Sequence, residues 1–575
     1  MAHSDEELDE ARRRRTETSD QLLASDSSKK LVVAGPGTGK THNFKRVLEK
    51  AGGGLALTFI RALARDLERD LGELAQVNTF HGYCKHVAHK LGGVQGLTEQ
   101  FDYYPSLPTL VVEDLHACGQ PSVTAAAIET AQRYMDDGEG LITAALAIGD
   151  YYDAVGHTDV VYRVQRHFGS RPQDIPEHPV VVVDEYQDFN LLETALIDSL
   201  AERSPVLIAG DDDQALYGFK DASAQYIREL AQREDVDRFD LPYCSRCTEV
   251  VVNGVNRIVD AAQAGGNLAG RVDREYLCYL PDKAQDSDDH PALIHAACSV
   301  ENNRSPYMRR YVAEEVRAIP EEDIRASREG GHATALVIGR LHFVTPIYEH
   351  LKTEFPNVYL QRSEPSVIDA LDGYERVARN PNSRLGWRIL LHVDPCDGVA
   401  GLLEAAHGHD RELGDLLPVE YRERHLEVAA LVAKLLNEDE LSEDDLQRLT
   451  AALDMDVESI KNALALDPDE EPEDGDPEDP DSPKIVCTSL VGAKGLSAEH
   501  VFIVGFIDGE FPRDPSAIAD DEICELIVGL SRTRKACHLV SCGNWAGNWC
   551  KPSSFLRWFG DLPIEQRAIR KAYWQ

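Results

Sequence analysis

Short apolar runs recur along the chain and predict the strands of parallel sheets. Those in the first half lie at residues 30–34, 55–59, 180–183 and 206–209. Those in the second half lie at residues 335–338, 485–488, 501–505 and 537–540. Runs of this length are typical of strands that are buried on both faces, and helical patterns lie between them. The chain is therefore predicted to be α/β, with two domains built on parallel sheets.

Two stretches between these strands favour helices. Residues 95–170 are predicted to be a mostly helical insertion in the first domain, and residues 370–466 in the second. The acidic, proline-rich run at residues 467–483 cannot bury enough apolar surface to fold, so we expect a disordered linker. A DNA-mimicking role for this run is an alternative. The predicted first domain comprises residues 1–94 and 171–270, and the second comprises residues 271–369 and 484–575.

Length and composition add two expectations. A chain of 575 residues exceeds one ordinary core, which agrees with several domains. No stretch reaches the roughly 18 to 20 apolar residues of a membrane-spanning helix. The first twenty residues are charged throughout and do not resemble a signal peptide, so a cytoplasmic protein is expected.

The twelve cysteines do not predict a disulfide framework in a cytoplasmic chain of this size. Cys244 and Cys247 have C-x-x-C spacing. A second group lies near the C-terminus, at Cys524, Cys537, Cys542 and Cys550. A zinc site usually takes four ligands at recognisable spacings, and neither group supplies them. Buried structural thiols are the favoured interpretation, and a metal site is the alternative.

A glycine-rich stretch follows the first predicted strand and precedes a helical pattern. It reads Ala34-Gly35-Pro36-Gly37-Thr38-Gly39-Lys40-Thr41 and departs from G-x-x-x-x-G-K-[ST] only at the alanine. The glycines let backbone N–H groups surround phosphates, and the helix N-terminus adds partial positive charge. Lys40 is expected to reach the β- and γ-phosphates of ATP, and Thr41 to ligate Mg²⁺. An ordinary strand-to-helix turn is the alternative.

A pair of carboxylates follows the predicted strand at residues 180–183. In a P-loop fold, carboxylates at this end of a strand lie beside the phosphate loop. Asp184 would hold Mg²⁺ directly or through water, and Glu185 would polarise the attacking water. Acids that cap a following helix are common at such positions. The phosphate loop earlier in the chain makes the catalytic interpretation the stronger one.

Several segments resemble the motifs of the UvrD/Rep-type superfamily 1 helicases. Residues 184–188, DEYQD, resemble motif II, and residues 209–220, AGDDDQALYGFK, resemble motif III. Further resembling segments follow the family's order along the chain, at residues 57–59, 78–82, 241–247, 488–496 and 528–534. The resemblance implies two RecA-like P-loop NTPase domains with ATP between them. It also implies an ATP-hydrolysing DNA helicase or translocase that moves 3′-to-5′ on single-stranded DNA, in DNA repair, recombination or phage defence.

The resemblance also implies roles for single residues. Gln21 would read the adenine, and Gln214 would couple the γ-phosphate to DNA contacts. Arg246 and Arg532 would act as arginine fingers that stabilise charge during phosphoryl transfer. A surface salt bridge is the alternative for either arginine. Residues implied to contact DNA are Thr58, Phe59, His81, Tyr217 and Phe219, where aromatic rings would stack on bases without sequence preference. Core packing is the alternative for the aromatic residues, and Phe219 is favoured over Phe59 as a stacking platform.

The chain departs from the family pattern near the nucleotide. Ser497 stands where a glutamate usually follows motif V, and Cys244 stands where motif IV usually has asparagine. Ser245 replaces the usual tyrosine, which removes an aromatic ring expected near the adenine. We expect ATP hydrolysis to persist with altered base and sugar selectivity.

The formal net charge of −41 is unusual for a protein that binds nucleic acid, because phosphate contacts need a basic surface. A basic groove on an otherwise acidic surface is one explanation, and a salt-adapted or otherwise biased composition is another. The acidity and the short insertions also motivate a second hypothesis, an ATP-switched regulatory subunit that partners a nuclease. An RNA motor and a degenerate ATP-binding scaffold are further alternatives.

Overall fold

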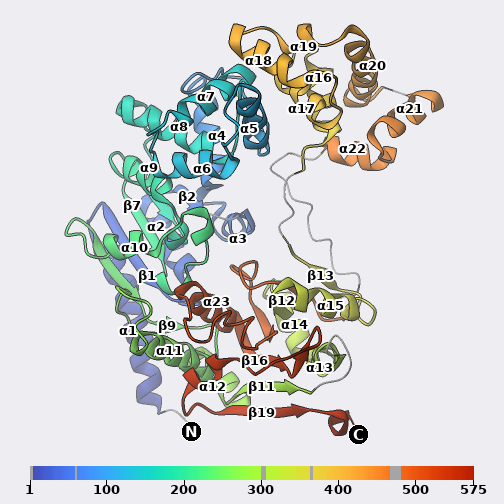
Figure 1. Ribbon diagram of the computed structural model, residues 1–575. Helices are drawn as coiled ribbons and strands as arrows, with labels where there is room; N and C mark the ends of the chain where they lie inside the picture. The colour runs from blue at the N-terminus through green and yellow to red at the C-terminus, as the bar shows by residue number, and fades with distance from the viewer. Residues whose placement is uncertain are drawn as a thin grey trace.

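The computed structural model describes residues 4–58, 61–299, 306–362, 367–439, 441–465, 479 and 481–574. Two parallel sheets, each flanked by helices, form one side of the molecule, and two helical parts lie together at the other (Figure 1). This arrangement confirms the predicted α/β fold with two parallel sheets, and it fits RecA-like P-loop domains.

The first sheet has six parallel strands in the order β3-β2-β6-β7-β1-β8. The central strands are β1 (Lys29–Ala34), β2 (Gly54–Thr58), β6 (Val181–Val183) and β7 (Val206–Gly210), all at predicted positions. The edge strands are β3 (Ala75–Thr79) and β8 (Asp237–Leu241), which the apolar runs did not predict. Edge strands are half-exposed and carry polar residues, so their sequences, AQVNT and DRFDL, lack a continuous apolar run.

Side chains of β1 alternate between the two faces of this sheet. Leu31 and Val33 pack with Phe80 of α4 on one face. Val32 packs with Phe44 of α2 on the other. The helices of this domain are α1 (Asp5–Ala24), α2 (Lys40–Ala51), α3 (Arg61–Leu71), α4 (Phe80–Lys90), α9 (Leu191–Ala201) and α10 (Ala224–Leu230). The next helix, α11 (Glu249–Ala264), packs in the hydrophobic core of the second sheet. Short 3₁₀ turns follow the central strands at η2 (Tyr186–Asp188), η3 (Asp212–Gln214) and η4 (Gly218–Lys220).

The second sheet has seven parallel strands in the order β13-β14-β12-β15-β16-β11-β19. Its predicted strands are β12 (Ala333–Gly339), β14 (Ile485–Ser489), β15 (Ala498–Val504) and β16 (Thr533–Cys542). The sequence did not predict β11 (Leu293–Cys298), β13 (Val358–Leu360) or β19 (Ile564–Ile569). The flanking helices are α12 (Leu280–Asp289), α13 (Pro306–Arg317), α14 (Glu321–Glu329), α15 (Leu341–Leu351) and α23 (Asp520–Ser531), with η5 (Ser554–Phe559) and η6 (Lys571–Trp574) near the C-terminus.

Helices fill most of the stretch between β3 and β6. They are α5 (Leu107–Ala117), α6 (Ala125–Tyr134), α7 (Leu141–Tyr152) and α8 (His157–Ser170), with β4 (Asp102–Tyr103), β5 (Ala154–Val155) and η1 (Pro172–Asp174). Arg163 of α8 is fully buried and donates to Asp150 and Asp159, so its charge is paired inside this helical part.

The stretch between β13 and β14 forms the second helical part. Its helices are α16 (Ala370–Arg379), α17 (Arg384–Val393), α18 (Val399–His409), α19 (Leu413–Leu416), α20 (Val419–Leu436), α21 (Glu443–Leu453) and α22 (Val457–Ala465). The acidic run at residues 467–483 lies outside the described residues except at Asp479 and residues 481–483.

The two helical parts share one hydrophobic core, and α17 and α18 lie beside α5 (Figure 1). A buried ionic cluster crosses their boundary. Arg388 Nε donates to Asp114 Oδ1 at 2.7 Å, and His407 Nε2 lies 2.7 Å from Asp114 Oδ2. The paired charges hold the two helical parts together.

All twelve cysteines are free thiols, and most of them are buried. Within the described ranges, no helix is both long and apolar enough to cross a membrane.

Candidate nucleotide-binding site

The glycine-rich loop connects β1 to α2, and Lys40 is the first residue of that helix. Gly37 and Gly39 have φ values of +70° and +89°, a backbone conformation that glycine adopts without strain. Thr38 Oγ1 donates to the Gly35 carbonyl at 2.8 Å, which closes the loop on itself. The loop therefore has the shape that surrounds phosphates at a helix N-terminus.

Lys40 lies against the two carboxylates that follow β6. Its Nζ is 2.7 Å from Glu185 Oε1 and 3.0 Å from Asp184 Oδ1. Glu185 has a φ of +57°, and such strain in a residue other than glycine is typical of functional sites. The structure thus brings together the lysine and both acids that the sequence predicted.

Burial and charge act against each other at these acids. Burial alone would raise the pKa of Glu185, but the charges of Lys40 and Lys494 outweigh it and hold that pKa well below its usual value. Burial raises the pKa of Asp184 even though Lys40 opposes the shift. Glu185 is therefore an ionised acceptor at neutral pH, as a residue that orients a water molecule must be.

Thr41 is the second residue of α2 and is half-buried beside the same loop. A hydroxyl oxygen and the Asp184 carboxylate are hard ligands of the kind that Mg²⁺ prefers. The donor set at this end of the sheet therefore fits Mg²⁺.

Arg532 reaches the same site from the second sheet. It caps α23, is 3% exposed, and donates from Nη2 to Gln214 Oε1 at 2.8 Å. Burial, with Arg246 nearby, lowers the pKa of Arg532 to about 10, so the guanidinium still carries its charge at neutral pH. Burial at this depth does not fit the surface salt bridge considered as the alternative.

Arg246 lies between the phosphate loop and α23. Its Nη1 donates to the Ser531 carbonyl at 3.2 Å. A Cβ built on Gly37 would lie 2.5 Å from Arg246 Cβ, so the arginine backbone packs directly on the loop. Of the two predicted arginine fingers, Arg246 therefore lies beside the phosphate loop and Arg532 lies beside Gln214.

Lys494 also belongs to this site, although no role was predicted for it from the sequence. It is 5% exposed, and its Nζ donates to Asp188 and, at 2.8 Å, to the Gln214 carbonyl. The same Nζ is 3.5 Å from Glu185 Oε2. Lys494 lies in the segment that resembles motif V, and this position was the available signal. Its buried charge links the second sheet to both acidic segments of the first.

Three consecutive aspartates, Asp211 to Asp213, form another cluster that the sequence left without a role. Among the described residues, they are the one group of three close acidic, histidine or cysteine ligands that could hold a metal ion. Arg274, 3% exposed on its side chain, pairs with all three, and its Nη1 is 2.7 Å from Asp212 Oδ1. Arg271 pairs with Asp213 at 2.8 Å. Arginine charges therefore neutralise this cluster, and a cation is not required.

Gln21 is exposed on α1, and its implied role in reading adenine stays a prediction. The helix itself is attached to the phosphate-loop helix. Ser19 Oγ donates to Asn43 Oδ1 at 2.5 Å, and Asn43 Nδ2 donates to the Gly39 carbonyl at 3.1 Å. Asp20 accepts from Arg46 at 2.9 Å.

The residues implied to contact DNA differ in exposure. Phe219 is 68% exposed, which does not fit the core-packing alternative. Tyr217 is half-buried, with its ring centroid 5.7 Å from that of Phe219, and Lys494 Nζ lies 5.8 Å from the Tyr217 centroid. Thr58 is fully buried at the end of β2, and its Oγ1 has no hydrogen-bond partner among the described residues.

Two further DNA predictions remain. His81 is half-buried at the start of α4, with its ring 5.1 Å from that of His157. Phe59 lies outside the described residues.

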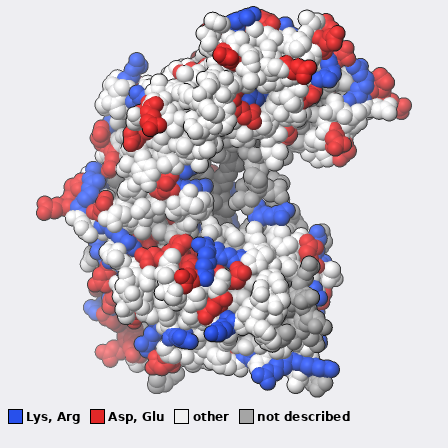
Figure 2. Space-filling model, in the orientation of Figure 1, with Lys and Arg blue, Asp and Glu red and all other residues white. Residues whose placement is uncertain are grey.

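On the face drawn in Figure 2, acidic and basic side chains are interspersed, and the surface is hollowed between the upper and lower parts.

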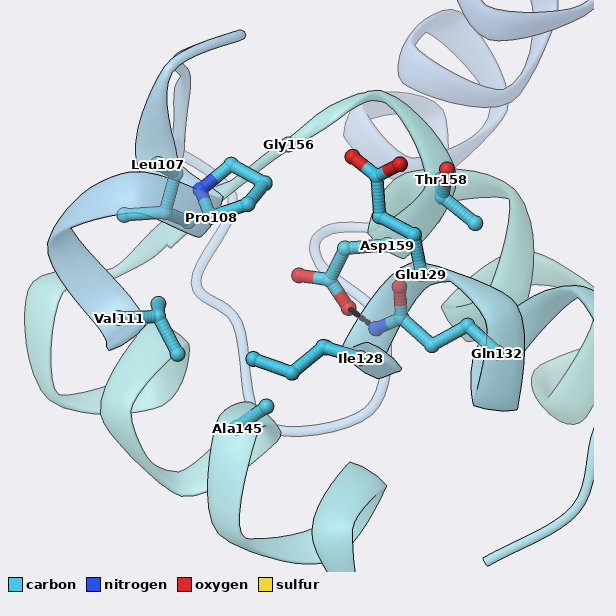
Figure 3. Close-up of a pocket in the computed structure, with 10 residues that line it drawn as sticks. All are labelled: Leu107, Pro108, Val111, Ile128, Glu129, Gln132, Ala145, Gly156, Thr158 and Asp159. Atoms are coloured by element: carbon cyan, nitrogen blue, oxygen red, sulfur yellow. Dashed lines mark hydrogen bonds between the residues drawn. The ribbon is translucent and has the colours of Figure 1, made fainter. Parts of the chain in front are cut away.

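A pocket among α5 to α8 lies apart from these residues (Figure 3). Its lining is mainly apolar, with Gln132 donating to Asp159 Oδ1 at 3.3 Å. None of the predicted site residues lines it, so the candidate site remains at the ends of the two sheets.

The parallel sheets, the glycine-rich loop at a helix N-terminus and the acidic pair beside Lys40 define a P-loop NTPase fold with two RecA-like sheets. Comparison with known proteins agrees with this assignment of the fold. Residues 20–220 match a family model described as an AAA domain.

Three relatives are ATP-dependent DNA helicases by name. The chain is 23% identical to UvrD1 of Mycobacterium tuberculosis over 677 residues, which covers 95% of this chain and 84% of that protein. It is 25% identical to UvrD2 of the same species, over 67% of this chain and 50% of that protein. It is 25% identical to PcrA of Staphylococcus epidermidis, over 40% of this chain and 37% of that protein. The chain is therefore similar to UvrD/Rep-type superfamily 1 helicases, in agreement with the resemblance of its motifs.

Proposed function

We propose that this chain is an ATP-dependent DNA helicase or translocase that hydrolyses ATP with Mg²⁺ and moves 3′-to-5′ on single-stranded DNA. The observation that carries the proposal is the contact of Arg532 and Lys494 with Gln214, next to the acids beside Lys40. Residues from both sheets meet at one site, so hydrolysis there can be coupled to movement of one sheet against the other. The names of the relatives support DNA as the substrate.

In this proposal, each residue has a distinct task. Lys40 exchanges its contacts with Asp184 and Glu185 for the β- and γ-phosphates. Thr41 and Asp184 would hold Mg²⁺, which neutralises phosphate charge when it is bound. The ionised Glu185 accepts a hydrogen bond from the attacking water and orients it.

The two arginines supply positive charge as the phosphoryl group is transferred. Arg532 is buried and already directed at Gln214, so little reorganisation is needed when charge develops. Arg246 packs directly against the phosphate loop at Gly37. The arrangement is that of an arginine finger, for which rate contributions of roughly 10³ to 10⁵ are typical.

Coupling to DNA would run through the loop after Gln214. Tyr217 and Phe219 follow within five residues, and Phe219 presents an exposed ring. Stacking on such rings is sequence-independent and contributes roughly 1 to 3 kcal/mol per base. This suits a motor that steps along any sequence. The 3′-to-5′ direction and a role in DNA repair, recombination or phage defence rest on the family resemblance.

The test is steady-state ATP hydrolysis with and without single-stranded DNA, across a salt series. Lys40→Ala and Glu185→Gln serve as inactive controls. DNA stimulation that both substitutions abolish supports the proposal, and unwinding of duplexes with 3′ or 5′ tails then reports direction. Wild-type activity that stays at the level of the controls at every salt concentration would contradict an autonomous motor. The regulatory subunit of a nuclease complex would then be the hypothesis to pursue.

A further inference from the structure

Two cysteines flank Arg246, between β9 (Tyr243–Cys244) and α11. Cys244 and Cys247 are both fully buried. The backbone N–H of Cys247 donates to Cys244 Sγ at 3.4 Å, so this sulfur lies over the turn that leads into the helix. A strand, a C-x-x-C turn and a helix follow in that order, and C-x-x-C turns of this kind are known to undergo thiol–disulfide exchange.

The two sulfurs contact opposite walls of the nucleotide site. A Cβ built on Gly37 would lie 3.1 Å from Cys244 Sγ, so this sulfur lies against the phosphate loop. Cys247 Sγ donates to the Ser531 carbonyl at 3.6 Å, and Arg246 Nη1 donates to the same carbonyl at 3.2 Å. The turn from Cys244 to Cys247 therefore joins the phosphate loop to the end of α23.

The surroundings favour a reactive thiolate at Cys244. Burial alone would raise the pKa of its thiol, but hydrogen bonds to its sulfur, including those from the backbone N–H groups of Cys247 and Arg246, outweigh burial and lower it. A thiolate is the form of cysteine that attacks disulfides.

We propose that Cys244 and Cys247 are a redox modification site, and that a reversible disulfide between them switches off the nucleotide site. The effect on ATP turnover rests on the proposed function, whereas formation of the disulfide does not. The co-reactant is a low-molecular-weight disulfide.

The reaction proceeds in two exchange steps. The Cys244 thiolate attacks the small disulfide, which forms a mixed disulfide and releases one small thiolate. Cys247 gives its S–H proton to the small thiolate released first, and its sulfur then attacks Cys244 Sγ and releases the second small thiolate. Two protein thiols lose two electrons and two protons overall, and the small disulfide is reduced to two thiols.

The disulfide changes both walls. Cys247 no longer has an S–H to donate to the Ser531 carbonyl, and a bond across the turn changes the position of Arg246 between the two sulfurs. Both sulfurs are buried, so a small oxidant reaches them when the two walls separate. The disulfide therefore forms while the phosphate loop and the end of α23 are apart. It then prevents them from returning to the arrangement that supports hydrolysis.

The experiment compares the full chain before and after treatment with glutathione disulfide. We expect peptide mass mapping to show a disulfide between Cys244 and Cys247. We expect DNA-stimulated ATP hydrolysis to fall by about tenfold or more and to recover fully with dithiothreitol. The variant Cys244→Ser, compared with its own untreated activity, should lose the sensitivity. Cys247→Ser should stop at the mixed disulfide on Cys244, which mass mapping detects as a bound glutathione. Cys118→Ser, at an exposed cysteine between α5 and α6, should retain both full activity and full sensitivity.

Three results would overturn the proposal. They are a protein that forms no Cys244–Cys247 disulfide, a disulfide to Cys278 instead, and sensitivity that persists in Cys244→Ser. Cys278 is the nearest competitor, because its strand β10 (Leu277–Cys278) pairs with β9 in register with Cys244. If the reduced protein hydrolyses no ATP, the proposed function fails on its own. Mass mapping and binding of a fluorescent ATP analogue before and after oxidation then still decide the switch.

Discussion

Arg532 Nη2 donates a hydrogen bond to Gln214 Oε1 at 2.8 Å, across the boundary between the two sheets. Gln214 presents its oxygen to the arginine because its Nε2 donates to Asp211 Oδ2 at 2.6 Å on the other side. An amide has one accepting and one donating end, so the aspartate fixes which end faces Arg532. The hydrogen bond therefore joins the second sheet to the loop that carries Tyr217 and Phe219.

Substitution of Arg532 is expected to affect turnover more than ATP binding. In Arg532→Lys, kcat should fall by roughly 10³-fold or more with a smaller change in KM, because a finger acts on charge that develops in the transition state. The matched control is Arg534→Lys, since Arg534 is a neighbouring arginine whose Nε donates to Ser497 Oγ at 3.3 Å rather than to Gln214. Equal losses in both variants would argue against a specific role for Arg532.

Phe219 is expected to matter for DNA and not for hydrolysis itself. Phe219→Ala should weaken binding of single-stranded DNA by roughly 1 to 3 kcal/mol, the usual loss of one stacking contact, and leave ATP hydrolysis without DNA unchanged. Fluorescence anisotropy with a labelled oligonucleotide measures the first quantity. Tyr134→Ala is the control, because Tyr134 is a 48% exposed aromatic residue on α6. If Tyr134→Ala weakens binding equally, exposure of an aromatic ring, not its position, explains the effect.

Arg274 is expected to be a strong contributor to stability. It is the arginine that pairs with Asp211, Asp212 and Asp213. Its removal leaves the buried Asp211 without a counter-charge, while Arg228 and Arg271 still pair with the other two aspartates. Arg274→Met should cost about 3 to 5 kcal/mol, as for other broken buried ion pairs. Arg228→Met is the comparison, since Arg228 pairs with Asp212 alone. Thermal unfolding followed by circular dichroism should show a clearly larger loss of stability for Arg274→Met. Equal losses in the two variants would contradict the interpretation that Arg274 stabilises all three aspartates.

The sequence predicted the central strands and the phosphate-loop site because both depend on local patterns. Buried strands such as β6 need unbroken apolar runs. Asp184 follows β6 directly, and Lys40 follows β1 after the glycine-rich loop. Edge strands were missed for the same reason. In β8, Arg238 and Asp240 alternate with apolar residues, so the segment carries no apolar run.

Pairings between distant segments could not be predicted in this way. Arg274 pairs with Asp211, which is 63 residues away in the sequence, and Lys494 pairs with Asp188, which is 306 residues away. Arg388 meets Asp114 from 274 residues away and joins the two helical parts. Each charge is plausible as a solvated surface residue until the fold buries it, because the sequence records residue type and not the partner across the interface.

The free energy of unfolding is expected to fall between pH 5 and pH 8 because of Glu193, which is 3% exposed in the first turn of α9. Burial raises the pKa of this carboxyl from 4.5 to about 7, although the backbone N–H of Asn190 opposes the shift. The unfolded chain therefore loses its proton near pH 4.5 and the folded chain near pH 7. Below that window both states are protonated and Glu193 imposes no penalty, whereas above it the folded state must ionise a buried acid. A penalty of up to about 3 kcal/mol follows.

The measurement is the melting temperature of wild type and Glu193→Gln at pH 5 and pH 8. Glutamine keeps an oxygen that accepts from Asn190 N, a contact of 2.9 Å in the wild type, and it does not titrate. The variant should therefore lose less stability than wild type as the pH rises, while Glu202→Gln, at an exposed position at the end of α9, should follow wild type. A pH dependence in Glu193→Gln as steep as that of wild type would assign the effect to other groups.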